Sequence, residues 1–415
     1  TTCCRNHCFW SSIPVLGGVM DSYWLEWFEV LFRWLHLLVG VAWIGSSLHF
    51  VRVDRGLEPD EHDASVQGRF WAIHGGGVYQ FTKFNLAPKD WPANLHWSKW
   101  EAYTTWLSGI VLLVLIYYVQ ADVYLVAAHE PHVSAGQAIA ISLAMIVGAV
   151  GLYEILIRSQ LAAHTRSFAV LVAALILGLC WLADHFLASR AAFIHVGVVL
   201  GSIMVGNVFF GIIPAQKAFV AAVRQGQAPD QAITQLARQR SFFNNYLTLP
   251  VLFCMISLHF SMLYQNTWGF LGLFTVMLAG AIARHFFNLR HIKIVQWRYL
   301  IIPAVMVLIV MLLFRPPAPA QKPSVSLKDV PTLRSEAEID QLVATHCGNC
   351  HAKQPAHPGF FAPPGGLLFE NHQDLLAQRA RASSAIASGY MPLGNASGFQ
   401  ASDRTDLMQY LIKSQ

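Results

Sequence analysis

Residues 33–50 read RWLHLLVGVAWIGSSLHF, an apolar stretch broken only by one arginine, two histidines and two serines. A run of about 18 predominantly apolar residues is long enough to cross a bilayer as a helix. Runs of this kind recur up to residue 314. We expect eight spans, at residues 28–51, 102–120, 135–157, 168–188, 192–214, 246–264, 268–287 and 297–314.

The composition agrees with a membrane protein. Only 12% of the 415 residues are Asp, Glu, Lys or Arg, against about 25% in a typical soluble domain, and the mean hydropathy is +0.43. So few charges cannot cover a water-facing surface, so most of the chain must face lipid. This excludes a soluble enzyme, a nucleic-acid-binding protein and a disordered scaffold. We read the net charge of +5 as a topological signal.

The basic residues predict the orientation of these spans. The connections after spans one, three, five and seven carry sixteen lysines and arginines, whereas the opposite connections carry only Arg190. Basic residues concentrate in cytoplasmic loops. With eight spans, both ends of the membrane domain lie on the same side, so the C-terminus is predicted to face outward from the plasma membrane.

Composition divides the chain into four parts. Residues 20–314 form the membrane domain, residues 315–334 a proline-rich linker, and residues 335–415 a small soluble domain. Residues 1–19 hold three of the seven cysteines and lack the pattern of a signal peptide, so we expect an upstream or non-native segment there. The predicted fold class is all-α: a polytopic helix bundle plus a small all-α domain.

The sharpest motif is Cys347-Gly348-Asn349-Cys350-His351. CxxCH is the attachment pattern of c-type haem, in which two thiols bond the vinyl groups and the adjacent histidine is an axial iron ligand. A zinc half-site is the alternative, but no second cysteine pair follows it. Because c-type haem is attached outside the bacterial plasma membrane, the motif agrees with the predicted orientation. We expect one covalent haem c in a periplasmic domain resembling a class I cytochrome c.

The sixth ligand of the iron is expected downstream of the motif. Met391, which is followed by a proline, suits a loop over the distal face of the haem, and a His/Met pair raises the potential of the haem. Met408 lies in a predicted terminal helix and reads as a core residue. His357 and His372 are weaker candidates.

Ionisable residues inside spans are costly and usually functional. By position, His36, His195 and His259 fall toward the outer leaflet, and His49 and His285 toward the inner one. Two histidine layers raise the possibility of b-type haems that relay electrons. However, His36 and His49 are thirteen residues apart and point to different faces of one helix. Histidines satisfied by neighbouring helices are the alternative.

The inner connection at residues 68–101 is rich in aromatic residues, and we find no clear helix or strand period in it. It reads either as a membrane-surface anchor or as a pocket in which rings stack a planar ligand and cations hold an anion. His74 and His96 are its candidate functional residues. The HGGG run is no sign of an esterase, since no GxSxG motif accompanies it.

From Met20 onward the chain resembles the bacterial membrane-bound urate oxidases (urate hydroxylases), in which an eight-span domain precedes a cytochrome c domain. The resemblance is carried by RWLHLLVGVAWIGSSLHF, by WAIHGGGVYQFTKF and LHWSKWEAYTTW, and by CGNCH. It implies oxidation of urate to 5-hydroxyisourate without hydrogen peroxide. Electrons would pass through the haem held by Cys347, Cys350 and His351 to a terminal oxidase or a soluble cytochrome c.

The resemblance does not identify the residues of the urate pocket, so we infer candidates from the chemistry of urate. Urate is a planar anion whose oxidation needs a cation and a base, and histidine is the natural base near neutral pH. Arg33 and His36 at the outer face, or His74 and His96 at the inner loop, could supply them. Two other functions remain open: a quinol–cytochrome c oxidoreductase, and a transporter with a redox-sensing cytochrome domain.

Overall fold

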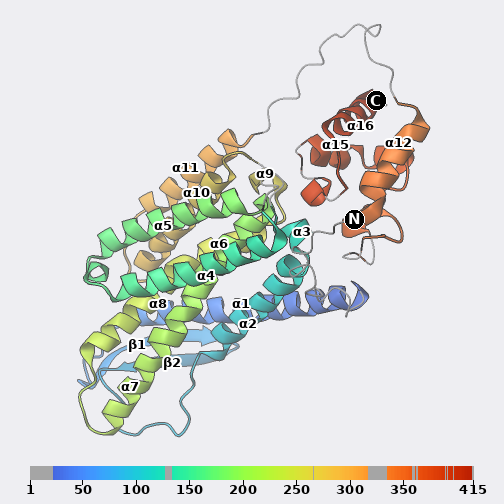
Figure 1. The fold of residues 1–415 in the computed structure, drawn as a ribbon. Helices are drawn as coiled ribbons and strands as arrows, with labels where there is room; N and C mark the ends of the chain where they lie inside the picture. Colours follow the sequence, from blue (N-terminus) through green and yellow to red (C-terminus); the bar gives the residue numbers. More distant parts are fainter. Residues whose placement is uncertain are drawn as a thin grey trace, which may run out of the picture. The chain divides into compact units, whose positions relative to one another are not determined.

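The computed structural model describes residues 22–126, 133–264, 266–315, 334–357, 360, 363–387, 389, 391–395 and 397–413. Its contacts group the chain into two compact units. One comprises Trp34–Ile110 and Ala140–Arg315, and the other Thr1–Arg33, Val111–Ile139 and Pro316–Gln415. Helices dominate both units (Figure 1), which confirms the predicted all-α class.

Long apolar helices make up the first part of the chain. They are α1 (Ser22–Arg55), α2 (Trp100–Leu113), α4 (Ala135–Arg158), α5 (Thr165–Phe186), α6 (Ser189–Gly206), α8 (Gln231–Ser257), α10 (Gly269–Arg290) and α11 (Arg298–Leu313). Shorter pieces connect them: α3 (Ala121–Tyr124), η3 (Gln160–Ala163), α7 (Ile213–Arg224), α9 (Ser261–Tyr264) and the π-helical segments η2 (Val114–Tyr118) and η4 (Asn207–Ile212).

Six helices of the described residues are long and apolar enough to cross a membrane, where we expected eight spans. The six match predicted spans one to five and seven. Predicted span 246–264 is broken, because α8 ends at Ser257 and a separate short helix, α9, begins at Ser261. Predicted span 297–314 is the 16-residue α11, about 24 Å long at 1.5 Å per residue and so shorter than a bilayer core of about 30 Å.

The core of the larger unit lies around α6. Most residues of α6 are buried, including Phe193, His195 and Leu200, which is expected of a helix that is apolar on every side. Helices α5 and α8 both contact α6, and α10 contacts α5, α8 and α11. This packing places the polar residues of α8 and α10 inside the bundle.

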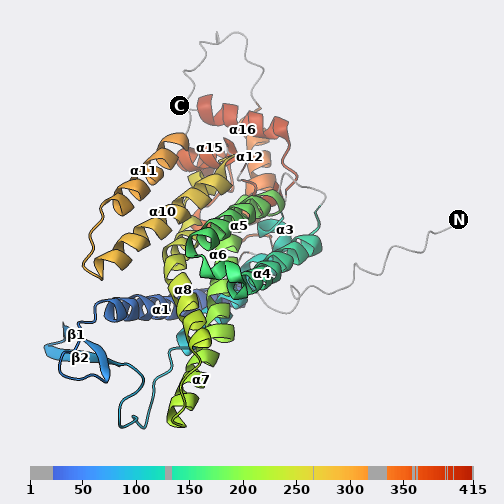
Figure 2. The ribbon, with the colours of Figure 1, turned by 90° about the vertical axis from the view of Figure 1, so that its left-hand side faces the viewer.

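A β-hairpin follows α1, where we expected no regular structure. Strands β1 (Val66–His74) and β2 (Gly77–Phe84) pair antiparallel, and Figure 2 shows them beside the end of α1. Gly75 and Gly76 have φ of +56° and +79°, as a two-residue hairpin turn requires. The glycine run is therefore a turn. Large apolar residues stand on both faces of the hairpin and remain exposed, so the sequence lacks the alternation that marks a half-buried strand.

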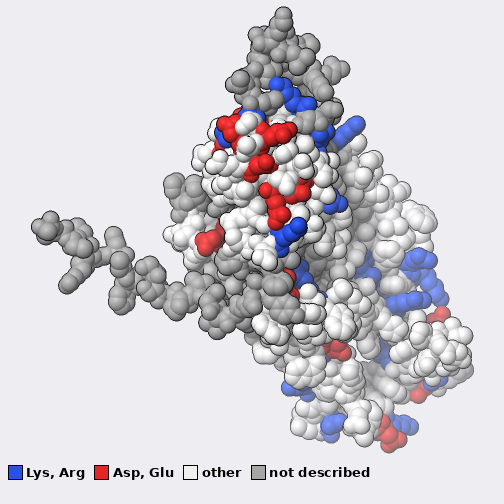
Figure 3. All heavy atoms as spheres, turned by 90° about the vertical axis from the view of Figure 1, so that its right-hand side faces the viewer, with Lys and Arg blue, Asp and Glu red and all other residues white. Residues whose placement is uncertain are grey.

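The C-terminal residues form a separate set of short helices. They are α12 (Glu336–Val343), the π-helical segment η5 (Ala344–Gly348), α13 (Asn349–His351), η6 (Pro364–Gly366), α14 (His372–Ala377), α15 (Arg379–Ala387), η7 (Leu393–Asn395) and α16 (Ala401–Lys413). Their own core includes Ile339, Leu375 and Leu407. Ser335 and Glu338 form a capping box that starts α12. Acidic side chains gather on one face of this domain (Figure 3).

Candidate functional site

The CxxCH motif lies where η5 passes into α13. Cys347 packs against the C-terminal core, and both Cys347 and Cys350 are free thiols. Burial raises the pKa of the Cys347 thiol to about 12. A π-helical segment within a helix is often found at a functional site.

His351 is oriented by a backbone carbonyl. Its Nδ1 lies 2.8 Å from the Leu367 oxygen, and a carbonyl can only accept, so Nδ1 carries the proton and Nε2 keeps its lone pair. Axial histidines of metals are fixed in this way. The ring is buried against Phe369, and burial lowers the pKa of His351. The motif thus has the chemistry that a covalent haem needs.

The candidates for the sixth ligand differ in their surroundings. Met391 is half-buried in the segment that follows α15, and its carbonyl accepts from Arg404. Met408 packs against the C-terminal core, as predicted. The His372 ring is committed to Asp340 at 2.8 Å, whereas His357 is half-buried beside Phe360. Met391 therefore stays the predicted sixth ligand.

Two of the histidines predicted for the outer leaflet, His36 and His195, lie on long helices, and in each of them Nδ1 is hydrogen-bonded to a backbone carbonyl. His36 donates from Nδ1 to the Thr105 carbonyl at 2.9 Å, with Ser108 Oγ at 3.1 Å, and a side chain at Gly109 would collide with its ring. His195 is fully buried and donates from Nδ1 to the Ala191 carbonyl at 2.7 Å. In each ring the lone pair is then on Nε2. This arrangement is compatible with an iron ligand, and it is equally compatible with a histidine that only packs in the core.

The other membrane histidines are less enclosed. His259 and His49 are exposed, and the His49 ring meets Phe81 of the hairpin edge-on. His285 is half-buried, and its Nδ1 lies 2.6 Å from the Tyr246 hydroxyl. Among the described hydrogen bonds and ring contacts, none joins two of the five predicted histidines. No group of three His, Cys, Asp or Glu side chains in the described part of the chain could hold a metal ion.

The three remaining catalytic candidates are exposed. Arg33 pairs with Glu29 one turn earlier on α1. His74 ends β1 at the hairpin turn, and His96 lies 3.8 Å from Glu101 with its side chain 79% exposed. Residues 68–101 therefore do not close around a ligand through these histidines.

A buried ion pair joins α4 to α8. The fully buried Arg240 donates two hydrogen bonds to Glu154, at 2.7 and 2.8 Å, and a third to Asn207 at 3.1 Å. Glu154 also receives Arg158 at 2.6 Å. The positive charge of Arg240 is thus neutralised within the protein, as a structural ion pair requires.

A second polar cluster, not anticipated from the sequence, lies between the ends of α1 and α10 and the middle of α8. Arg284 donates from Nε to Asn245 Oδ1 at 2.7 Å, and Asn245 donates to Asn288 Oδ1 at 3.0 Å. Arg55 donates to the Asn288 carbonyl at 3.1 Å. The signal available was the spacing: Arg284 and Asn288 are four residues apart in an apolar helix and so share one face.

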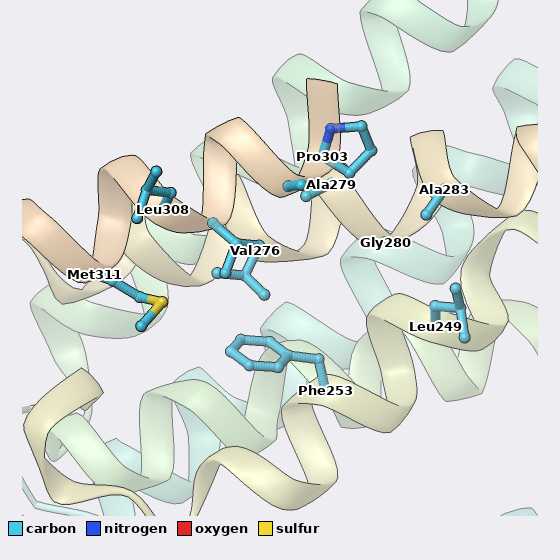
Figure 4. Close-up of a pocket in the computed structure, with 11 residues that line it drawn as sticks. Leu249, Phe253, Val276, Ala279, Gly280, Ala283, Pro303, Leu308 and Met311 are labelled. Carbon is cyan, nitrogen blue, oxygen red and sulfur yellow. The ribbon is translucent and has the colours of Figure 1, made fainter. Parts of the chain in front are cut away.

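An apolar groove of about 590 Å³ lies between α8, α10 and α11 (Figure 4). The side chains that line it are all apolar, with Phe253, Val276 and Met311 among them. Such a groove can take a lipid or isoprenoid chain, but it offers no charged or hydrogen-bonding side chain to a polar anion. It is not a pocket for urate.

Comparison with known families finds one match. The family described as urate oxidase N-terminal matches residues 22–315, which is more than half of the chain. Neither the curated proteins nor the solved structures yield a significant match. The matched range contains the ion pair of Arg240, the cluster of Arg284 and all five predicted membrane histidines.

Proposed function

Because the chain belongs to the urate oxidase N-terminal family over residues 22–315, it is an oxidoreductase acting on urate, and we propose that it passes the electrons to the respiratory chain through a c-type haem. Conversion of the urate monoanion to 5-hydroxyisourate takes its new oxygen atom from water and releases one proton and two electrons. Electrons that leave through a haem do not reduce oxygen at the urate site. Hydrogen peroxide is therefore not a product.

The observation that carries this proposal is the CxxCH motif in a compact helical domain. Cys347 and Cys350 would hold the porphyrin covalently, His351 would bind the iron through Nε2, and Met391 would be the second side chain that binds it. When bound, the haem would take up electrons one at a time, so two transfers are needed for each urate. The Leu367 carbonyl keeps the His351 ring in the orientation and tautomer that this role needs.

The positions of the basic residues support a periplasmic location of the C-terminal domain. Basic residues favour the inner face at the ends of α1 and α10, and attachment of c-type haem takes place outside the bacterial plasma membrane. We therefore place the C-terminal domain in the periplasm. A terminal oxidase or a soluble cytochrome c on that side would accept the electrons. A b-type haem at His36 or His195 remains a candidate relay.

The test is anaerobic. Urate is added to the oxidised full-length protein in membranes, and the absorption of the c-type haem is followed. We expect reduction, with none in a Cys347→Ser/Cys350→Ser variant, which lacks the attachment site. If the haem stays oxidised with urate but is reduced by a quinol, the protein is a quinol–cytochrome c oxidoreductase instead. The apolar groove would then be the place to look for the quinol tail.

A transporter with a redox-sensing domain makes a different prediction. The Cys347→Ser/Cys350→Ser variant would then still carry urate into sealed vesicles at the wild-type rate. Under our proposal the same variant neither accumulates urate nor oxidises it.

A further inference from the structure

Two buried arginines of the bundle have opposite electrostatic surroundings. Arg240 is 0% exposed and shares two hydrogen bonds with the carboxylate of Glu154. Arg284 is 6% exposed, and in the described part of the chain no carboxylate lies within ion-pair distance of it. A buried charge without a counter-charge is strongly unfavourable. The charge of Arg284 therefore points to an anion that is not part of the chain.

The unsatisfied atoms around Arg284 are all donors. Arg284 Nη2 is buried and has no hydrogen-bond partner, whereas Asn288 Nδ2 makes no hydrogen bond of ordinary geometry and only a weaker contact with Tyr246; Asn288 is 1% exposed. Asn245 fixes both side chains, because it accepts from Arg284 and donates to Asn288. Buried polar groups in folded proteins are nearly always satisfied. What is missing here is a hydrogen-bond acceptor.

More positive charge surrounds this position. Arg55 of α1 donates to the Asn288 carbonyl and lies with its guanidinium 4.6 Å from the centre of the Phe242 ring. Burial lowers the pKa of His291, and the four charges that lower it further are all arginines: Arg284, Arg52, Arg55 and Arg290. A patch lined by one sign of charge concentrates ligands of the opposite sign.

Aromatic and titratable groups complete the arrangement. Tyr246 is hydrogen-bonded to His285 at 2.6 Å, with the two rings stacked at 24°. Tyr299 meets the His285 ring edge-on at 4.6 Å. Tyr246, His285 and Tyr299 are half-buried, so this side of the cluster reaches the surface. Rings of this kind can stack on a flat conjugated ligand.

We propose that the cluster of Arg55, Asn245, Arg284, His285 and Asn288, the Arg284 cluster, is the binding site of the urate anion. The inference rests on the proposed function, since it names where that substrate binds. Urate is flat and negatively charged and carries three carbonyl oxygens. Arg284 Nη2 and Asn288 Nδ2 would donate to these oxygens, while Arg55 would supply the second positive charge. His285 is the group placed to take up the proton that urate releases.

The test is equilibrium dialysis of radiolabelled urate against the detergent-solubilised full-length protein, without oxygen. Removing a charge-assisted hydrogen bond lowers affinity by about 10- to 100-fold. We expect that loss in Arg284→Gln and a clear loss in Arg55→Gln. Arg238→Gln is the matched control, because Arg238 is an exposed arginine on α8 and its replacement removes the same charge. This control should bind urate within about twofold of wild type.

A thermal shift shows whether the variants are folded. Arg284→Gln removes an unpaired buried charge, so without urate it should melt no lower than wild type, and urate should stabilise only wild type and the Arg238→Gln control. If Arg284→Gln fails to fold, urate binding by Arg55→Gln tests the proposed site instead, because Arg55 is half-buried at the end of a different helix. Loss of binding in Arg55→Gln then supports the site, and unchanged binding overturns it.

The outcomes separate this site from the proposed function. Equal urate affinity of Arg284→Gln and Arg238→Gln would overturn the site, even if urate reduces the haem of both. Loss of binding in Arg284→Gln upholds the site even if the haem is never reduced, in which case the proposed electron path fails. The cluster could instead hold a phosphate, free or in a lipid headgroup. Displacement of urate by millimolar inorganic phosphate, or urate binding to none of the proteins, would overturn the assignment.

Discussion

Gly211 is the position at which the buried ion pair can be tested most directly. It lies in the π-helical segment η4, and a Cβ there would collide with the Cδ and Nε atoms of Arg240. Gly211→Ala must therefore move Arg240 away from Glu154 and Asn207. Breaking a buried ion pair costs about 3–5 kcal/mol, and a helical Gly→Ala change returns about 1 kcal/mol. Because the Glu154 side chain is 24% exposed, we take the lower end, a net loss of about 2–3 kcal/mol.

The assay is thermal unfolding of the solubilised protein, with Gly201→Ala as the control. Gly201 lies on the preceding helix α6, and a Cβ there meets nothing within 4 Å. At about 2–4 °C for each kcal/mol, Gly211→Ala should lower Tm by about 4–12 °C, whereas Gly201→Ala should leave it equal or slightly higher. Equal Tm values for the two alanine variants would refute this account of the ion pair.

Three further predictions concern the rest of the chain. Met391→Ala should leave the haem attached but lower its midpoint potential, measured by redox titration; Met408→Ala, in the core, should lower Tm without that shift. Truncation after Phe314 should give a folded membrane domain whose oxygen uptake with urate is lost, and full-rate uptake would contradict the proposed electron path. The His372 backbone N–H and then its ring hold the pKa of Asp340 below its usual range, so this stabilisation is present above the unfolded pKa of about 3.9 and lost as pH falls through the folded value. Asp340→Asn should therefore lower Tm at pH 7, with the difference shrinking as pH falls below the unfolded pKa of about 3.9.

The parts of the fold that the sequence predicts well are those governed by one local signal. The span at 135–157 matches α4 (Ala135–Arg158) almost to the residue, because an apolar helix satisfies its own backbone and needs no partner. Met408 is expected near the core from its place in a predicted terminal helix, and it packs, partly buried, against the C-terminal core. The haem motif is found from spacing alone, since its chemistry is contained in five consecutive residues.

What the sequence does not reveal depends on contacts between distant residues. The hairpin at Val66–Phe84 is missed because both of its faces are apolar, so the strand period is absent. Arg284 is read only as a topological charge, because nothing local distinguishes a buried, unpaired arginine from one that faces water. Arg240 is likewise counted among the loop charges, because its partner Glu154 lies 86 positions away in the sequence and no local pattern links the two residues.

The two proposals together set a requirement on the electron path. The arginine distribution predicts that the Arg284 cluster lies at the inner end of the bundle, whereas haem attachment requires the C-terminal domain to lie outside. A hydrocarbon core of about 30 Å then separates the substrate from the CxxCH motif. Direct transfer over that distance is too slow for turnover, so the two proposals together predict a buried redox group between them. Of the five predicted histidines, His195 is the fully buried one, on the central helix α6 with Nδ1 held by a carbonyl, and it is therefore the first ligand to test for such a group.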